Sequence, residues 1–249
     1  MQKSFNLCLN YHDFSGPWSS GSKSNYTIDF DKFKIQLSEL KNIRNIDLAD
    51  LLSSDKPNEN SYSLTFDDGL KSNLYIAEEL AKQELIGTFF IIKDKCLSNN
   101  RFLSKNEIRS LVDLGMKIGS HSCTHRHLNR LPRIELIREL QESKFFLEDI
   151  TGKPINVIAF PGGQCGKREF ELSRKVGYLL NRTTISGLNY TPLKNDIIKC
   201  INVKNEMNNE TFKQIIGLSP MFFAKAKLRE WLLSFPKYLE SSYESMTKY

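Results

Sequence analysis

The chain has 249 residues, of which 40% are hydrophobic and 26% are charged, and its formal net charge is +6. This composition is typical of a globular protein and excludes wholesale disorder. The length suits one large domain with a substantial core. A solvated, lysine-rich surface explains the mild positive charge, which would also attract phosphate-bearing substrates or an anionic membrane. No stretch approaches the ~20 apolar residues that a membrane-spanning helix needs.

Two features favour a cytoplasmic location. The N-terminal segment lacks the apolar core of a secretory signal, because polar residues such as Asn6, Asn10 and Asp13 interrupt every apolar run. The five cysteines are odd in number and form no CxxC pair. Free thiols in a reducing compartment suit this pattern better than a disulfide framework.

Strand and helix patterns alternate along the chain. Short β-favouring or apolar runs predict strands at residues 5–9, 61–66, 87–92, 116–120, 155–160 and 178–183. Apolar residues at helical spacing predict helices at 74–81, 104–114, 132–151 and 168–176. The second of these helices opens with a capping box of Ser104 and Glu107, and Gly152 ends the third. The repeated βαβα order predicts a parallel sheet with helices outside it, either open or closed into a barrel.

Functional residues gather at the strand ends of such folds. Asp67 and Asp68 follow the strand at 61–66 directly and precede Gly69. An isolated Asp-Asp-Gly sequence is most often a turn with a helix cap. At a strand end, however, two adjacent carboxylates can divide the work of hydrolysis: one binds a cation and the other takes a proton from water.

The strand at 116–120 is followed by the sequence HSCTH, which places His121 and His125 four residues apart. Neutral imidazoles at this spacing can turn toward one point, and they are favoured ligands for Zn²⁺ and related metals. The alternative is a histidine-rich surface loop, and His127 in the same segment is interpreted as structural. One aspartate and two histidines would form a three-ligand site with room for water, as hydrolytic metal sites require.

The sequence Phe160-Pro161-Gly162-Gly163 closes the next strand. It is either an ordinary turn or the wall of a pocket, in which glycine lets a backbone N–H approach a substrate oxygen closely. We therefore treat Pro161, Gly162 and Gly163 as candidate substrate-binding residues.

These motifs resemble those of the polysaccharide deacetylase family, the NodB-homology domain of carbohydrate esterase family 4. TFDDG at 65–69 and HSCTH at 121–125 match its first two motifs, and FPGG at 160–163 resembles the third. The resemblance extends over most of the chain. It implies an α/β fold, a distorted (β/α) barrel with fewer than eight parallel strands. It also implies hydrolysis of an N-acetyl group from a sugar.

The same resemblance implies individual roles. Asp67 is the general base, and Asp68, His121 and His125 hold a divalent metal ion. Zn²⁺ is the expected ion, with Co²⁺, Ni²⁺, Fe²⁺ and Mn²⁺ as alternatives. The metal and a backbone N–H near Gly162 stabilise the oxyanion.

Two departures from the family pattern concern the groups around the base. The family's third motif starts with an arginine that orients the base, but Ala159 stands at that position. Arg182, on a neighbouring strand end, is a candidate replacement and is grouped with the substrate-binding residues. The family's late histidine, which supplies the general acid, is also absent, because no histidine follows His127.

A candidate for the missing acid lies near the N-terminus. Residues 10–13 (NYHD) resemble the YH motif of a permuted branch that is similar to the poly-N-acetylglucosamine deacetylases. This resemblance makes His12 the expected acid. The alternative is a histidine in an N-terminal turn.

We expect residues 1–218 to form the barrel and residues 219–249 to form a helical tail. Aromatic and basic residues interleave in the tail. This pattern suits either a helix packed on the barrel or an amphipathic helix in peripheral contact with a membrane.

The leading hypothesis is an enzyme that acts on an N-acetylated sugar or glycan precursor, without a nucleic-acid partner. One alternative is a catalytically weak carbohydrate-binding relative that kept the metal site and lost the arginine. Another is an N-deformylase acting on a lipid-linked sugar. The sequence indicates no oligomeric state.

Overall fold

The computed structural model describes residues 4–16, 24–52, 59–98 and 100–219, together with 221 and 224. The chain divides into two units, residues 1–207 and 208–249, which are described separately. All candidate site residues belong to the first unit. The second contains helix α7 (Asn209–Ile216). The expected boundary at residue 218 stays a prediction, and nearly all of the tail lies outside the described residues.

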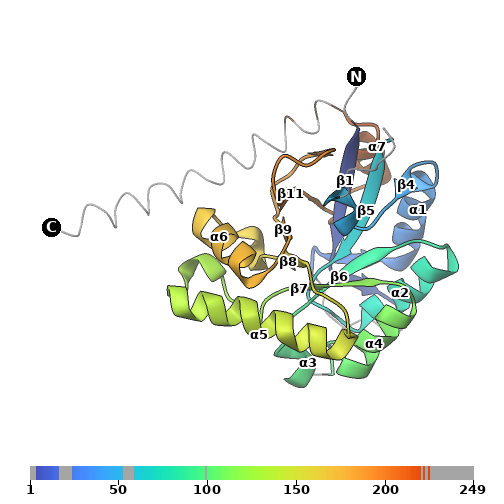
Figure 1. The fold of residues 1–249 in the computed structure, drawn as a ribbon. Helices are drawn as coiled ribbons and strands as arrows, with labels where there is room; N and C mark the ends of the chain where they lie inside the picture. Colours follow the sequence, from blue (N-terminus) through green and yellow to red (C-terminus); the bar gives the residue numbers. More distant parts are fainter. Residues whose placement is uncertain are drawn as a thin grey trace. The chain divides into compact units, whose positions relative to one another are not determined.

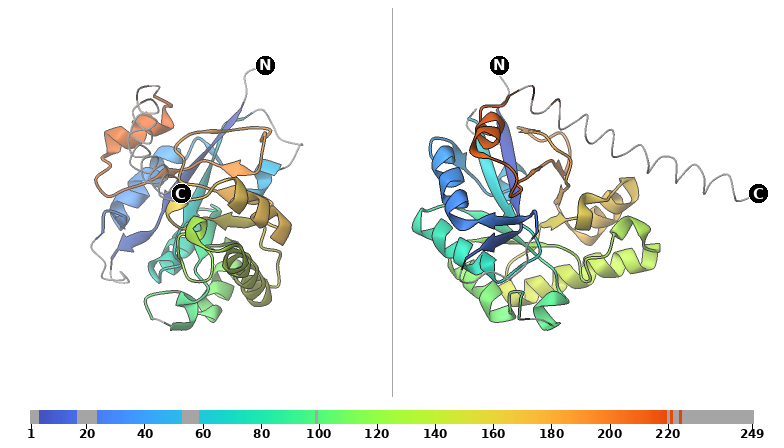
Figure 2. Two further views of the ribbon diagram at one scale, coloured as in Figure 1. Left: turned by 90° about the vertical axis from the view of Figure 1, so that its left-hand side faces the viewer. Right: turned by 180° about the vertical axis from the view of Figure 1, so that it is seen from behind.

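Helices surround the strands of the first unit (Figures 1 and 2). They are α1 (Phe30–Leu40), α2 (Ser72–Lys82), α3 (Lys95–Ser98), α4 (Lys105–Asp113), α5 (Arg133–Thr151) and α6 (Lys167–Val176). Single 3-10 turns lie at η1 (Ala49–Leu52), η2 (Leu128–Arg130) and η3 (Pro161–Gly163). In the described part of the chain, no helix is both long enough and apolar enough to span a lipid bilayer.

The strands form one large sheet and a small pair. They are β1 (Phe5–Tyr11), β2 (Asp13–Ser15), β3 (Thr27–Asp29), β4 (Arg44–Asn45), β5 (Ser61–Phe66), β6 (Gly87–Ile91), β7 (Lys117–Ser120), β8 (Val157–Ala159), β9 (Leu180–Arg182), β10 (Asn189–Tyr190), β11 (Ile197–Ile198) and β12 (Ile201–Asn202). The large sheet has the order β10-β1-β5-β6-β7-β8-β9-β11, and β2 pairs with β3 separately.

A short segment nearly closes the large sheet into a barrel. Every pairing from β1 to β11 is parallel, whereas β10 pairs antiparallel with β1. β11 pairs with β9 and the following β12 pairs with β1, so residues 197–202 connect the two edges of the parallel path (Figure 1). That path, β1-β5-β6-β7-β8-β9-β11, has seven strands. The predicted distorted barrel with fewer than eight parallel strands is confirmed for this path, and β10, β12 and β4 bring the whole sheet to ten strands.

The elements predicted from local patterns are present with small shifts at their ends. Strand β5 covers the predicted residues 61–66. Ser104 and Glu107 form the predicted capping box at the start of α4. Helix α5 ends at Gly152, whose φ of 62° is left-handed and therefore favours glycine.

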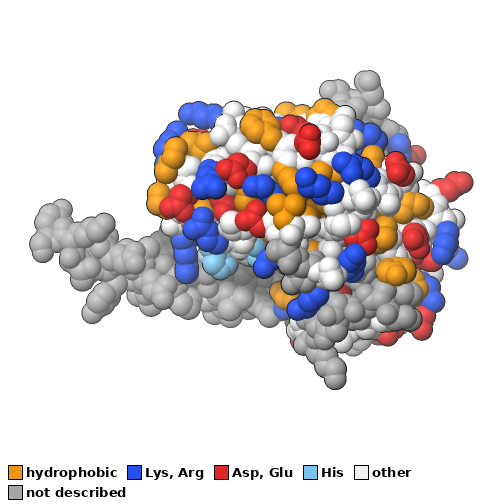
Figure 3. Space-filling view, turned by 90° about the horizontal axis from the view of Figure 1, so that it is seen from below, with side chains coloured by type: hydrophobic (Ala, Val, Ile, Leu, Met, Phe, Trp, Pro, Cys, Tyr) orange, Lys and Arg blue, Asp and Glu red, His pale blue; other side chains and the backbone are white. Residues whose placement is uncertain are grey.

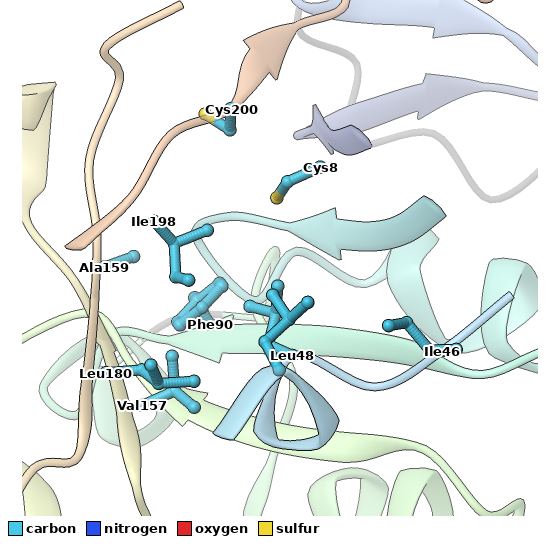
Figure 4. Packing of buried hydrophobic residues seen from close by; sticks show 10 residues of the cluster. Cys8, Ile46, Leu48, Phe90, Val157, Ala159, Leu180, Ile198 and Cys200 are labelled. Atoms are coloured by element: carbon cyan, nitrogen blue, oxygen red, sulfur yellow. The ribbon is translucent and has the colours of Figure 1, made fainter. Parts of the chain in front are cut away.

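Apolar side chains from five strands of the parallel path, together with residues 46–51 and 200, form a buried core cluster (Figure 4). The cluster consists of Cys8, Ile46, Leu48, Leu51, Phe90, Val157, Ala159, Leu180, Ile198 and Cys200. Phe90 also lies under the guanidinium of Arg182, with 5.0 Å between the guanidinium carbon and the ring centroid. The core therefore supports a charged residue of the candidate site directly.

Charged side chains of both signs mix over the face drawn in Figure 3. Some exposed charges of the protein pair locally, as Lys34 does with Asp31 and Arg138 with Glu142. Such pairs stabilise a fold by at most about 1 kcal/mol each. On this face the positive charge is therefore spread among acidic groups.

The close packing of β7 against the core can be tested at Gly119. A Cβ at this position would lie 2.4 Å from a ring carbon of Phe90. We expect Gly119→Ala to lower the free energy of unfolding by about 1–3 kcal/mol, the usual cost of overpacking, as measured by urea denaturation. Phe90→Leu removes the ring that alanine would meet, so the double variant should lose less stability than the two single losses added. Additive losses would contradict this account.

Candidate active site

Parallel strands bring the candidate residues to one end of the barrel. Tyr11 and Phe66 are register partners in β1 and β5, so His12 and Asp67 leave the sheet side by side. The Asp67 N–H donates to the Tyr11 carbonyl at 2.9 Å. Strand β7 ends next to β6 at Ser120, so the HSCTH sequence begins at the same end of the barrel.

Asp68, His121 and His125 form a cluster of three side chains that can each bind a metal ion. Their ligand atoms all lie within 4.8 Å of one another. Asp68 Oδ1 is 3.5 Å from His121 Nε2 and 3.3 Å from His125 Nε2. Atoms about 2.0–2.2 Å from a tetrahedral zinc ion are spaced about 3.3–3.6 Å apart. The two spacings between Asp68 and the histidines therefore fit a bound divalent ion.

The hydrogen bonds of the cluster support the same conclusion. His121 Nδ1 pairs with the Ala159 carbonyl at 2.7 Å and donates to it, since a carbonyl only accepts. Its Nε2 therefore presents a lone pair toward Asp68. Asp68 Oδ1 is buried and has no hydrogen-bond partner among the described residues. Two acceptor atoms facing each other in a buried site are costly unless a cation lies between them. This donor set suits Zn²⁺ and related ions.

The backbone at the cluster is strained. Asp68, Ser122 and His125 have positive φ values of 73°, 66° and 64°. Non-glycine residues rarely adopt this region, and each such residue costs about 1–3 kcal/mol. Two of the three potential ligands thus depend on backbone conformations that the surrounding structure must maintain.

Asp67 lies beside the cluster in a nearly dry environment, with 4% of the residue exposed. Its Oδ1 pairs with the Arg182 guanidinium, and its Oδ2 accepts a hydrogen bond from Asn10 Nδ2 at 3.0 Å. Burial raises the pKa of Asp67, but the charge of Arg182 and then those of His121 and His12 lower it, so the pKa lies below its usual range. The carboxyl group is therefore ionised near neutral pH.

Arg182 reaches Asp67 from the strand next to Ala159. The two residues are register partners in β8 and β9. Arg182 thus contacts Asp67 from the strand next to Ala159, as expected for a replacement of the family's arginine. The Arg182 side chain is fully buried beside Asp67, and its assignment as a substrate-binding residue stays a prediction.

His12 points toward Asp67. Its Nε2 lies 3.7 Å from Asp67 Oδ2, and its ring packs on Tyr26 with 4.5 Å between the ring centroids. His12 Nδ1 is buried without a hydrogen-bond partner among the described residues. His12 Nε2 is therefore the nitrogen that faces the site.

A family model for polysaccharide deacetylases matches residues 54–180, slightly more than half of the chain. The chain belongs to the polysaccharide deacetylase family. Both the family and the fold implied by the TFDDG and HSCTH motifs are thus confirmed.

Individual members of the family match over different lengths. YxkH of Bacillus subtilis is 28% identical over 138 residues, which span 55% of this chain and 49% of YxkH. The chain therefore matches about half the length of this relative. The deacetylase PplD of Streptococcus pyogenes, solved in complex with acetate, has a TM-score of 0.76 at 20% identity, covering 86% of this chain and 98% of PplD. BC0361, a polysaccharide deacetylase from Bacillus cereus, has a TM-score of 0.73 at 25% identity, covering 86% and 69% of the two chains.

The backbone conformation and close packing of the FPGG turn require its two glycines. Gly162 and Gly163 have φ values of 62° and 65°, and a Cβ on Gly163 would lie 1.8 Å from Thr184 Oγ1. The Gly163 N–H donates to the Phe160 carbonyl within the turn, so it is not free for a substrate. Gly162 is exposed, and a Cβ added to it would lie 2.9 Å from the ring of His127.

Sequence reasoning missed two buried residues that hold the site. Asn10 donates to Asp67, and Glu139 accepts hydrogen bonds from the N–H groups of Cys123 and Thr124. Each left a signal in the sequence. Asn10 interrupts the apolar run of β1, and Glu139 lies on the buried face of α5. A polar residue at a core position usually has a specific partner.

The buried ion pair can be tested by stability measurements. Arg182→Leu leaves the buried Asp67 carboxylate without its counter-charge, and we expect the free energy of unfolding to fall by about 3–5 kcal/mol. Combining Arg182→Leu with Asp67→Asn should cost less than the two single losses added. Arg174→Leu is the control, because Arg174 pairs with Asp196 at an exposed site and its loss should cost about 1 kcal/mol or less. Equal losses for Arg182→Leu and Arg174→Leu would contradict the prediction.

Proposed function

We propose that this protein uses a divalent metal ion to hydrolyse the N-acetyl group of an N-acetylated sugar in a glycan or glycan precursor. The observation that carries the proposal is the position of Asp67, an ionised carboxylate, directly beside the cluster of Asp68, His121 and His125. Family membership supports the reaction. PplD supports it as well, since acetate is the acid that deacetylation releases.

Asp67 is the proposed general base. A divalent ion bound at the cluster would act as a Lewis acid toward the acetamide carbonyl. Asp67 Oδ1 is paired with the cationic Arg182, whereas Oδ2 accepts one hydrogen bond from Asn10 and faces His12 and His121 at 3.7 and 4.0 Å. Oδ2 is therefore the oxygen that accepts the proton of the attacking water. Arg182 and Asn10 fix the carboxylate in this orientation.

His12 is the proposed general acid. The leaving nitrogen must receive a proton as the C–N bond breaks, and a positioned imidazole is a common donor. A substrate nitrogen that hydrogen-bonds to both His12 and Asp67 would hold these two side chains about 5–6 Å apart. The distance between His12 Nε2 and Asp67 Oδ2 is only 3.7 Å. The substrate nitrogen therefore approaches His12 from its open side, where 20% of the side chain is exposed.

The contact of Arg182 with Asp67 bears on the alternatives. The absence of an arginine at position 159 suggested a catalytically weak carbohydrate-binding protein. Because Arg182 pairs with the base from the neighbouring strand, that absence no longer favours the alternative. The mass of the released acid separates deacetylation from the N-deformylase alternative, since acetate and formate differ by one methylene.

The division of work between the two aspartates can be measured directly. Incubation of the metal-loaded protein with polymeric, lipid-linked and nucleotide-linked N-acetyl sugars should release acetate from at least one class. We expect Asp67→Asn to lower kcat by ~10²-fold or more with metal content nearly unchanged, because general-base catalysis commonly supplies that factor. Asp68→Asn should instead lose the metal. Equal metal loss in both variants, with equal activity in excess metal, would contradict these roles.

The role of His12 is testable with two types of leaving group. His12→Ala should lower kcat on an N-acetyl sugar by ~10²-fold or more, since the amine must be protonated as it leaves. Hydrolysis of an aryl acetate ester should fall much less, because a phenolate leaves without a proton. Metal content serves as the control and should not change. An equal loss on both substrates would assign His12 to positioning Asp67.

A further inference from the structure

We propose that Glu139 is a positioning residue that sets the affinity of the metal centre by holding the metal loop, residues 121–125. This inference rests on the metal-binding part of the proposed function. Glu139 lies on α5, far from the cluster in sequence, and is only 3% exposed. A carboxylate this deeply buried needs strong partners, and all of its side-chain contacts described here are with the metal loop and Arg126.

The carboxylate of Glu139 binds the backbone between the two histidine ligands. Its Oε2 accepts the N–H of Cys123 at 2.8 Å and the N–H of Thr124 at 2.9 Å. Its Oε1 accepts the Thr124 hydroxyl and lies 3.5 Å from Arg126 Nη2. One side chain thus satisfies two consecutive amides of the loop. Hydrogen bonds to a charged acceptor are stronger than those between neutral groups.

The loop needs such support because its backbone is strained at Ser122 and His125. On its other side, the N–H groups of Lys93 and Asp94 donate to the carbonyls of Ser122 and Cys123 at 3.1 and 3.0 Å. The segment after β6 therefore holds the carbonyls of the loop, and Glu139 holds its amides. Without Glu139, the amides of buried Cys123 and exposed Thr124 lose this shared partner, and the strained conformation loses both hydrogen bonds.

The two histidines depend on the loop to different degrees. His121 is anchored independently through Nδ1 to the Ala159 carbonyl. His125 lies at the end of the loop, its side chain is 40% exposed, and its N–H donates to the Ser122 hydroxyl. Loss of Glu139 should therefore release His125 first, and leave Asp68 and His121 as a weaker, two-residue site.

Helix α5 provides a rigid base for this contact. Ser143, one turn after Glu139, donates to the Glu139 carbonyl and accepts the Ser120 hydroxyl at 2.8 Å. Ser120 ends β7 and leads into the metal loop. The same helix offers a matched control in Glu142, a more exposed glutamate that pairs with Lys93 and Arg138 and binds no amide of the loop among its described contacts.

The test measures metal binding in the full chain. Zn²⁺ affinity is obtained by competition with a chromogenic chelator, and the visible absorption of the Co²⁺-loaded protein reports its ligand set. We expect Glu139→Leu to weaken Zn²⁺ binding by about 10–100-fold, as is usual for residues that orient metal ligands. Its Co²⁺ spectrum should indicate fewer protein ligands. Glu139→Gln keeps one acceptor oxygen and should lose less, whereas Glu142→Leu should match the wild type.

The outcomes separate this inference from the proposed function. If the wild type binds neither Zn²⁺ nor Co²⁺, the metal centre is wrong and the role of Glu139 with it. If the wild type binds metal and Glu139→Leu retains its affinity and spectrum, only the role of Glu139 is overturned. Should Glu139→Leu fail to fold, Glu139→Gln decides. A several-fold loss of affinity with an altered spectrum supports the role, and wild-type values overturn it.

Discussion

The buried ion pair between Arg182 and Asp67 is the constraint on which the rest of the site depends. Both side chains are almost fully removed from water, so each would be strongly destabilising without the other. The pair lies on the core, because the Arg182 guanidinium stacks on Phe90. It also determines the chemistry of Asp67, since a low pKa keeps the carboxylate ionised and at the same time makes it a weak base. In the proposed role of base, Asp67 would therefore depend on a cation at the cluster to make the attacking water more acidic.

The barrel closure connects this ion pair to the backbone. Strand β11 pairs with β9 at the position of Arg182, and β12 pairs with β1 at Asn10. The side-chain amide of Asn10 donates through Nδ2 to both Asp67 and Asn202 and accepts the Thr65 hydroxyl at Oδ1, so its orientation is fixed. Residues 197–202 therefore pair with both strands whose side chains hold Asp67. The pairings of β11 with β9 and of β12 with β1 therefore nearly close the sheet and also help to orient Asp67.

Local patterns were sufficient to predict the main elements but not their pairings. Strand β5 and helices α4 and α5 follow from β-favouring runs, helical spacing and capping residues, which act within a few residues. The strands β10 to β12 have two residues each, too short for any periodicity, and exist because β1 and β9 offer partners. The convergence of Asp68, His121 and His125 was predictable because the motifs place these residues at strand ends. The buried position of Arg182, by contrast, depends on strand register, and Glu139 acts across a helix–loop contact that no spacing in the sequence encodes.

The register also explains how an arginine can be supplied by a different strand. Ala159 and Arg182 are opposite each other in adjacent parallel strands, and side chains at paired positions point to the same side of a sheet. An arginine on either strand would thus enter the same region of the barrel interior, where Asp67 lies. The interior is packed, so it has room for one such side chain, and the small Ala159 leaves that room to Arg182. The position of the guanidinium relative to Asp67 is therefore the physical requirement of the site. The strand that supplies it is free to change.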